Sequence, residues 1–371
     1  MKASRSGFDL RIILFVIIVF GVLVGGSLWL VDRYLVSTHV TIPGGELEPY
    51  WPTKGWRKAT PRDVGMNQAM LDEMLELIRE QGVAVDSVLV IRNGYLVIDE
   101  YFPPFSKGEK HPVFSCTKSV VSTLIGIAID EGYIEGVDQR VLDFFPNRTI
   151  QNLSPWKDAM TLGNLLTMSA GFDARDSYLY GWERLRSMLE SNDPVQYVLD
   201  LPVAEKPGTR FEYTNGVSHL LSAIVSETTG MSASRFAEEH LFTPLNITDF
   251  VWEGDPQGRN WGFSNLHLTP DDMAKLGYLF LNEGMWDDEQ IVSQEWVEAA
   301  TTSHIEATLV DGYGYQWWVD SEGYYQALGY NGQFIYVVAD YNLVVVFTGS
   351  SAEDFDVPRY LLETYIILAV D

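Results

Sequence analysis

The first clear feature in the pattern of apolar and polar residues is an uncharged run of 20 residues, Ile12 to Val31. At 1.5 Å per residue, a helix of this length can cross a bilayer. Lys2, Arg5 and Arg11 precede the run. Because cytoplasmic flanks carry the excess of Lys and Arg, the pattern predicts a cytoplasmic N-terminus (1–11), a transmembrane anchor (12–31) and an extracytoplasmic remainder, on the periplasmic or cell-surface side.

The alternative to an anchor is a cleaved signal peptide, because Gly25-Gly26-Ser27 has the small residues of a cleavage site. Further apolar residues follow these three, however, whereas a cleavage site normally ends the apolar region. A buried core helix would have a polar face, and this run has none. The next stretch, 32–62, is rich in Gly, Pro, Thr and Trp without clear periodicity, which predicts a linker. The folded domain is then expected over 63–371.

At the start of this domain the apolar spacing changes from helical to strand-like. Met66 to Gln81 has apolar residues at helical spacing and is followed by Gly82, so it predicts a helix and its end. Two apolar runs, Ser87–Arg92 and Tyr95–Tyr101, are joined by Asn93-Gly94. That pair is a strong hairpin signal, because both turn positions need positive φ.

A second set of strand-like runs lies near the other end of the chain: Gly323–Leu328, Phe334–Asp340 and Leu343–Gly349. Helical patterns occupy 296–304 and 358–370. Strands at both ends and a long helical middle predict an α/β domain with one antiparallel sheet made from the two termini. Helices would flank this sheet, and a helical insertion would span about 135–270.

Charge and composition exclude several classes of protein. The chain has 51 acidic and 25 basic residues, a net charge of −26, without a compensating basic stripe. Such a surface repels phosphate backbones, so nucleic acid is not an expected partner. Cys116 is the single cysteine, so no intramolecular disulfide can form. The six histidines form no HExxH pair or Cys/His cluster, so no metal site is predicted.

Ser115 and Lys118 open a helix that is predicted to run to about Asp130, and their spacing places both side chains on one face of its first turn. A serine hydroxyl needs an adjacent base to become a nucleophile. A lysine serves as that base only if its pKa falls below its usual ~10.4, and burial and the helix dipole both act in that direction. The Ser115 N–H would point toward a developing oxyanion. The plainer alternative is a serine that caps the helix and a lysine in solvent.

A turn at Pro207-Gly208-Thr209 leads to Tyr213-Thr214-Asn215 and then to an apolar helix. Tyr213 can share a proton with Lys118 and protonate a leaving group, while Asn215 can hold Lys118 and a substrate carbonyl. Taken alone, Tyr-x-Asn would more simply be a tyrosine packed beneath a loop.

These motifs together resemble those of the serine β-lactamase-like superfamily, which includes class C β-lactamases, D-Ala-D-Ala carboxypeptidases, related esterases and 6-aminohexanoate-dimer hydrolases. The resemblance covers roughly residues 63–360. The motifs that carry it are Ser115–Ser119, Thr161–Gly171, Pro207–Asn215, Leu268–Gly277 and Gly312–Trp318. The resemblance implies a β-lactamase/DD-peptidase-like sheet with a helical subdomain. It implies a Ser115 acyl-enzyme with Lys118 and Tyr213 as proton-handling partners, small ester, amide or short-peptide substrates, and no metal or organic cofactor. Tyrosine in the second motif indicates the class C branch.

The third motif of the superfamily, Lys/His-Thr/Ser-Gly, should fall within Ala327–Gln333. Alignment on Gly329 makes the Tyr330 N–H the second oxyanion donor, and Gly332 is the alternative register. Neither register contains the cation that normally engages a substrate carboxylate, a loss of about 1.5–3 kcal/mol of recognition. The sequence therefore favours an ester or small-amide hydrolase. The alternative is a protein that binds β-lactams or peptidoglycan peptides: a carboxypeptidase, a β-lactamase or a sensor without turnover.

Four further features could have functional roles, but each also has a simpler explanation. Cys116 is expected to be a small buried filler rather than a nucleophile. The aromatic run from Tyr313 to Tyr325 is expected to be mostly core. Asp173 and Asp176 could meet a substrate ammonium group, but a solvated loop is favoured. An arginine elsewhere, such as Arg175 or Arg259, is the alternative source of the missing positive charge.

Overall fold

The computed structural model describes residues 50–173, 182–351 and 356–370, which belong to one compact unit, Tyr50–Asp371. The predicted cytoplasmic segment and anchor (1–31), and the first part of the predicted linker (32–49), lie outside the described residues. Within the described ranges, no helix combines the length and the apolar character needed to cross a membrane.

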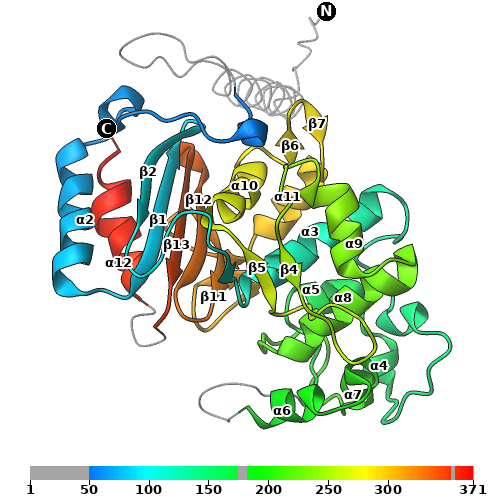
Figure 1. The fold of residues 1–371 in the computed structure, drawn as a ribbon. Helices are drawn as coiled ribbons and strands as arrows, with labels where there is room; N and C mark the ends of the chain where they lie inside the picture. The colour runs from blue at the N-terminus through cyan, green and yellow to red at the C-terminus, as the bar shows by residue number, and fades with distance from the viewer. Residues whose placement is uncertain (1–49, 174–181, 352–355, 371) are drawn as a thin grey trace, which may run out of the picture. The chain divides into compact units, whose positions relative to one another are not determined.

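The central sheet has eight antiparallel strands in the order β2-β1-β13-β12-β11-β10-β9-β8 (Figure 1). Its strands are β1 (Val85–Arg92), β2 (Tyr95–Tyr101), β8 (Ile305–Glu306), β9 (Gly312–Tyr313), β10 (Trp318–Val319), β11 (Tyr325–Gly329), β12 (Gln333–Val338) and β13 (Leu343–Gly349). Because β1 pairs with β13, both ends of the domain meet in one sheet, as the sequence predicted.

Turn and cap residues set the ends of the predicted elements. Asn93 and Gly94 have φ of 53° and 78°, so the β1–β2 hairpin has the positive-φ turn that its sequence indicated. The first helix, α2 (Gln68–Gln81), ends at Gly82 in the left-handed conformation. Every residue of β13 is buried, because helices cover both faces of the sheet. Figure 1 shows α2 and α12 (Val357–Leu361) on one side, and α10 (Pro270–Leu281) and α3 (Cys116–Asp130) on the other.

The middle of the chain is largely helical, as predicted. Its helices are α4 (Pro155–Asp158), α5 (Leu162–Leu166), α6 (Glu183–Leu189), α7 (Pro194–Asp200), α8 (Asn215–Thr229), α9 (Ala233–Ala237), η3 (Val141–Phe144) and η4 (Glu238–Phe242). The sequence missed a small sheet in the order β3-β5-β4, made of β3 (His111–Pro112), β5 (Leu266–Leu268) and β4 (Val251–Trp252). Strands of two or three residues have too little periodicity to be recognised.

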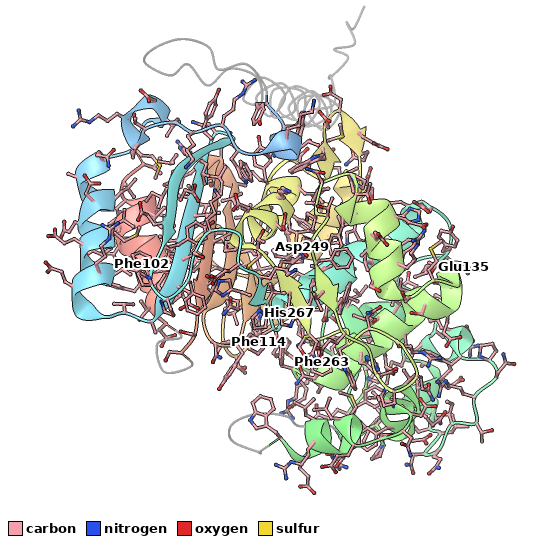
Figure 2. All side chains as sticks on the ribbon, viewed as in Figure 1. Phe102, Phe114, Glu135, Asp249, Phe263 and His267 are labelled. Carbon is pink, nitrogen blue, oxygen red and sulfur yellow. The ribbon has the colours of Figure 1, made fainter. Side chains whose placement is uncertain are left out.

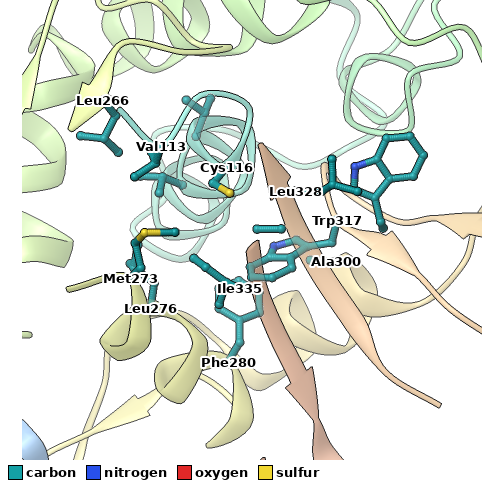
Figure 3. Packing of buried hydrophobic residues seen from close by; sticks show 14 of the residues in the cluster. Val113, Cys116, Leu266, Met273, Leu276, Phe280, Ala300, Trp317, Leu328 and Ile335 are labelled. Atoms are coloured by element: carbon teal, nitrogen blue, oxygen red, sulfur yellow. The ribbon is translucent and has the colours of Figure 1, made fainter. Parts of the chain in front are cut away.

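The remaining elements complete the second half of the domain: β6 (Met285–Trp286), β7 (Glu289–Gln290), α11 (Gln294–Thr301), η5 (Ala339–Tyr341) and η6 (Leu362–Ile367). The helix predicted over 358–370 is therefore divided into α12 and a π-helical turn, η6. Buried apolar side chains fill the space around α3, α10 and the β11–β12 part of the sheet, among them Cys116, Phe280 and Ile335 (Figure 3).

The linker prediction is wrong for residues 50–62, which fold onto the domain. This segment contains the short helices η1 (Pro52–Lys54) and η2 (Pro61–Val64). The Trp51 ring lies 5.8 Å from that of Trp286, whose Nε1 donates to Thr53 Oγ1 at 2.9 Å. Aromatic burial of this kind anchors a segment without regular periodicity, so spacing alone could not reveal it.

Candidate active site

The chain reaches Ser115 through the small sheet. His111 in β3 pairs with Leu268 in β5, and the Val113 N–H donates to Leu266 O at 2.9 Å. Phe114 then has φ of 45°, a conformation that a non-glycine residue rarely adopts, and the chain turns directly into α3. Ser115 occupies the N-terminal cap position, but its side chain makes no capping hydrogen bond. The interpretation of Ser115 as a simple helix cap is therefore wrong.

Lys118 is buried, with 1% of its surface exposed, so the alternative of a solvated lysine is also wrong. Its Nζ lies 3.0 Å from Ser115 Oγ, 2.8 Å from Asn215 Oδ1 and 3.3 Å from the carbonyl oxygen of Phe263. Three acceptors match the three N–H donors of an ammonium. After loss of one proton, the amine keeps two donors for Asn215 and Phe263 and has a lone pair for the Ser115 hydroxyl. This arrangement is the one expected of a base beside a nucleophile.

Tyr213 approaches the same two residues from the segment before α8. Lys118 Nζ lies 4.7 Å from its ring centroid. The ring stacks on Trp318, with centroids 5.5 Å apart and an interplanar angle of 25°, and Tyr313 and Phe211 lie beside it. Burial raises the pKa of Tyr213, and a hydrogen bond with the Ser115 hydroxyl opposes that change without cancelling it. The phenol is therefore protonated at neutral pH and can supply a proton.

Asn215 is the first residue of α8 and is buried. Its carbonyl oxygen accepts the Lys118 bond described above. Because α8 begins at this residue, its side chain is fixed by a rigid helix rather than by a loop, which suits a group that orients Lys118.

The last residue of β11, Gly329, lies against the start of α3. A Cβ at Gly329 would be 2.4 Å from Val113 O and 3.3 Å from Cys116 Sγ, so only glycine permits this approach. Gly332 instead has φ of 88° and lies in the β11–β12 turn beside Gly349. Gly329 is therefore the glycine that neighbours the Ser115 segment.

Tyr330 follows Gly329 and is 44% exposed, and its ring packs edge-on against Phe114 with centroids 5.6 Å apart. Ala327, two residues before Gly329, is fully buried and supplies no charge. All six residues predicted from the sequence thus converge on the start of α3. Phe114 and Phe263, which neighbour this point, lie between the sheet and the helical region (Figure 2).

Two contributors to the candidate active site were not predicted from the sequence. One is the Phe263 carbonyl, which no residue type encodes. The other is Gln316, which is 2% exposed and has φ of 62°. Its Nε2 donates to Leu166 O at 2.9 Å, its Oε1 accepts from Ser218 Oγ at 2.6 Å, and its backbone carbonyl accepts from Ser119 Oγ at 2.8 Å. Gln316 therefore connects α5, α8 and α3. A glutamine within an aromatic segment was the only signal that the sequence offered.

Cys116 is buried beside Gln333 O, and burial raises the pKa of its thiol, so it is the packing residue that was predicted. Tyr313, Trp317, Trp318 and Tyr324 are buried, as expected for core. Asp173 pairs with Arg184 at 3.6 Å, and both are substantially exposed. Arg259 is engaged by Glu227 at 2.7 Å. Arg175 and Asp176 lie outside the described residues.

The antiparallel sheet, the helical region and the Ser-Lys pair at the start of α3 define a β-lactamase-like protein. The Beta-lactamase family model matches residues 67–364, and the chain belongs to this family. The resemblance inferred from the motifs is thereby confirmed, as is the α/β fold.

Similar proteins include a hydrolase, a penicillin-binding protein homologue and a carboxylesterase. The chain is 23% identical over 329 residues to 6-aminohexanoate-dimer hydrolase of Paenarthrobacter ureafaciens, covering 81% of this chain and 82% of that protein. A penicillin-binding protein homologue from Pyrococcus abyssi has a TM-score of 0.62 at 21% identity, covering 81% of this chain and 78% of the other. A family VIII carboxylesterase has a TM-score of 0.64 at 14% identity, covering 81% and 95%. At these identities the two structures show the fold alone.

Proposed function

We propose that this protein is a serine hydrolase that cleaves ester or small amide bonds through an acyl-enzyme on Ser115. The observation that carries the proposal is the contact of buried Lys118 Nζ with Ser115 Oγ at 3.0 Å. Members of the Beta-lactamase fold family are hydrolases, which supports the same reaction class. The roles of Ser115, Lys118, Tyr213, Asn215, Gly329 and Tyr330 are predictions from this geometry.

In the proposed acylation step, Lys118 Nζ takes the proton of Ser115 Oγ, and Oγ attacks the substrate carbonyl carbon. The carbonyl π pair moves to its oxygen, which the backbone N–H groups of Ser115 and Tyr330 stabilise. As the bond to the leaving group breaks, Tyr213 protonates that group and recovers a proton from the Lys118 ammonium. Lys118 is then neutral again. A water molecule releases the acyl group and returns the proton to Ser115.

The substrate is proposed to be uncharged near its scissile bond. Ala327 occupies the place of the cation that would engage a carboxylate, and it is fully buried. The exposed edge of the site is aromatic, since the Tyr330 ring packs against Phe114. A net charge of −26 also disfavours the approach of anions. A 6-aminohexanoate-dimer hydrolase and a carboxylesterase among the similar proteins agree with ester or amide cleavage.

Parallel kinetics on p-nitrophenyl butyrate and nitrocefin test this proposal. We expect kcat/KM for the neutral ester to exceed that for nitrocefin by about tenfold or more, because one charge-assisted bond corresponds to at least ~1.4 kcal/mol. Ser115→Ala should abolish turnover and keep the circular dichroism spectrum, since Ser115 makes no capping bond. Efficient nitrocefin turnover by the wild type would favour the β-lactamase alternative. Near-wild-type ester activity in Ser115→Ala would overturn the proposal.

We also propose that residues 12–31 anchor the chain in a membrane, with the hydrolase domain on the extracytoplasmic side. The support is the uncharged run of 20 residues preceded by Lys2, Arg5 and Arg11. Cell fractionation of the full chain tests this placement.

A further inference from the structure

The Phe263 carbonyl that accepts from Lys118 ends a loop, residues 253–263, which we call the strap. The strap packs along α8. A Cβ at Gly262 would lie 2.0 Å from Ser218 O, so the strap backbone is in direct contact with the helix. Ser222 Oγ donates to Asn260 O at 2.7 Å. The position of the strap on α8 therefore determines where the Phe263 carbonyl lies relative to Lys118.

A buried His–Asp pair joins the strap to α8 at the same place. His219 Nε2 lies 3.2 Å from Asp255 Oδ2, and both side chains are completely inaccessible to solvent. The other carboxylate oxygen, Oδ1, accepts from the backbone N–H groups of Gln257 at 2.8 Å and Arg259 at 2.9 Å. One carboxylate thus folds the tip of the strap and binds it to the helix.

The hydrogen bonds indicate the charge of Asp255. Burial acts to raise the pKa of Asp255, but the bonds from His219 and from the backbone N–H groups of Arg259 and Gln257 outweigh it, and the pKa is lowered. Asp255 is therefore a carboxylate. His219 Nδ1 is buried and has no hydrogen-bond partner among the described residues. The ring nitrogen that contacts the strap is therefore Nε2.

His219 lies four residues after Asn215 in α8, on the same face of the helix. The helix face that holds Lys118 through Asn215 Oδ1 therefore also holds the strap through His219. The His219 ring packs against the strap residue Trp261, with centroids 4.7 Å apart. Two of the acceptors of Lys118, the Asn215 side chain and the Phe263 carbonyl, are thus held in place by the same segment of α8.

We infer that His219 and Asp255 are positioning residues, which keep the strap on α8 so that the Phe263 carbonyl remains an acceptor for Lys118. This inference rests on the proposed function. At 3.3 Å, the Phe263 bond is the longest of the three Lys118 contacts given above. A retreat of the strap by about 1 Å would break it. Lys118 would then lose part of its alignment on Ser115 Oγ.

Loss of this acceptor has a pH signature. A carbonyl acceptor stabilises an ammonium more than an amine, so its loss favours the deprotonated base. The acidic limb of the kcat/KM profile, which reports the base of the free enzyme, should move to lower pH. The titratable side chains known to face Lys118 are Tyr213 and Cys116, and burial raises the pKa of both. They stay neutral across this range and do not obscure the limb.

The test compares three variants and one control variant of the full chain. His219→Phe keeps an aromatic ring but removes the donor, and Gly262→Ala displaces the strap while both residues of the His–Asp pair stay unsubstituted. We expect both to lower kcat on p-nitrophenyl butyrate by about 10- to 100-fold, to change KM little and to move the acidic limb to lower pH. His219→Gln keeps an amide donor and should recover most of kcat. Glu227→Gln breaks the exposed pair between α8 and the strap residue Arg259 and should behave as wild type.

Unchanged kcat and pH profile in a folded His219→Phe or Gly262→Ala variant would overturn the inference. A loss of kcat without movement of the acidic limb would also overturn it, because a general loss of stability leaves the limb in place. If His219→Phe does not fold, Gly262→Ala and His219→Gln still decide the question. A wild type that hydrolyses no ester and takes no fluorophosphonate on Ser115 would refute the proposed function instead, so the two failures are distinguishable.

Discussion

Lys118 is the residue on which the proposed chemistry depends most closely. It is buried without a carboxylate among the acceptors described above, which are a hydroxyl, an amide oxygen and a backbone carbonyl. A neutral set of acceptors allows the amine form to exist beside Ser115, whereas a buried carboxylate would hold the ammonium. Tyr213 presents its ring to Nζ and its hydroxyl to Ser115. The proposed exchange of one proton between the two side chains rests on these contacts.

If Lys118 and Tyr213 form one proton-handling unit, their substitutions should be non-additive. We expect Lys118→Ala to lower kcat for p-nitrophenyl butyrate by about 10²- to 10⁴-fold, and Tyr213→Phe to lower it by a comparable factor. The double variant should be only slightly worse than the poorer single variant. Steady-state kinetics on that ester measure the cycle, and logarithmic losses that simply add would show independent roles.

The sequence was sufficient to predict those site residues whose proposed roles depend on the chemistry of their side chains. Ser115, Lys118, Tyr213 and Asn215 stand at spacings that place functional groups at helix starts, and the structure brings them together. The Phe263 carbonyl was not predictable, because any residue supplies a carbonyl and only the path of the chain decides where it points.

At the scale of elements, the site lies where α3, α5 and α8 meet, and Gln316 connects all three. Its backbone has φ of 62°, which costs a non-glycine residue about 1 kcal/mol or more. Four hydrogen bonds of its side chain and backbone, to Leu166, Ser218 and Ser119, hold it there. Two of the helices supply the catalytic candidates, Lys118 from α3 and Asn215 from α8, so Gln316 helps to set the distance between them.

We expect Gln316→Ala to lower the free energy of unfolding by about 2–4 kcal/mol, because it leaves the buried Ser218 hydroxyl and helix carbonyls unpaired and keeps the positive φ. Gln316→Gly loses the same bonds but is relieved of the backbone strain, so it should be less destabilised by up to about 1 kcal/mol. Denaturant unfolding of both variants measures the difference. An Ala variant within about 0.5 kcal/mol of wild type would contradict this account of Gln316.

Elements with strong local signals were predicted correctly, including α2 with its Gly82 end and the hairpin at Asn93-Gly94. The strands β3, β4, β5, β8, β9 and β10 were not, since each has two or three residues. Their strand conformation depends on partners far away in the sequence, such as Leu268 for His111. The segment that carries the chain to Ser115 is among these, so its path had to come from the structure.

For the whole molecule, one antiparallel sheet from both ends of the domain was predictable because long apolar runs occur at each end and a helical pattern lies between them. The fold of residues 50–62 onto the domain was not, because Trp51 and Trp56 carry no periodic signal. The proposed anchor at 12–31 would decide which side of a membrane the domain occupies.

We expect the full chain to remain in the membrane pellet after a carbonate wash, and a variant without residues 12–31 to appear in the soluble fraction with its ester activity intact. The uncharged run of 20 residues is long enough to hold the chain by burial in lipid. Full chain recovered in the soluble fraction at its unprocessed mass would contradict the anchor. Recovery at a mass shortened after about residue 27 would assign the cleaved-signal alternative.

The most direct test of Ser115 as the nucleophile is intact-protein mass spectrometry after brief exposure to a p-nitrophenyl ester or a fluorophosphonate. We expect one added acyl or phosphonyl group, located on Ser115 by peptide mapping and absent from Ser115→Ala. Lys118→Ala should keep Ser115 but label much more slowly, since its hydroxyl then lacks the adjacent base. Labelling at another residue, or equal labelling of wild type and Ser115→Ala, would contradict the assignment of Ser115 as the nucleophile.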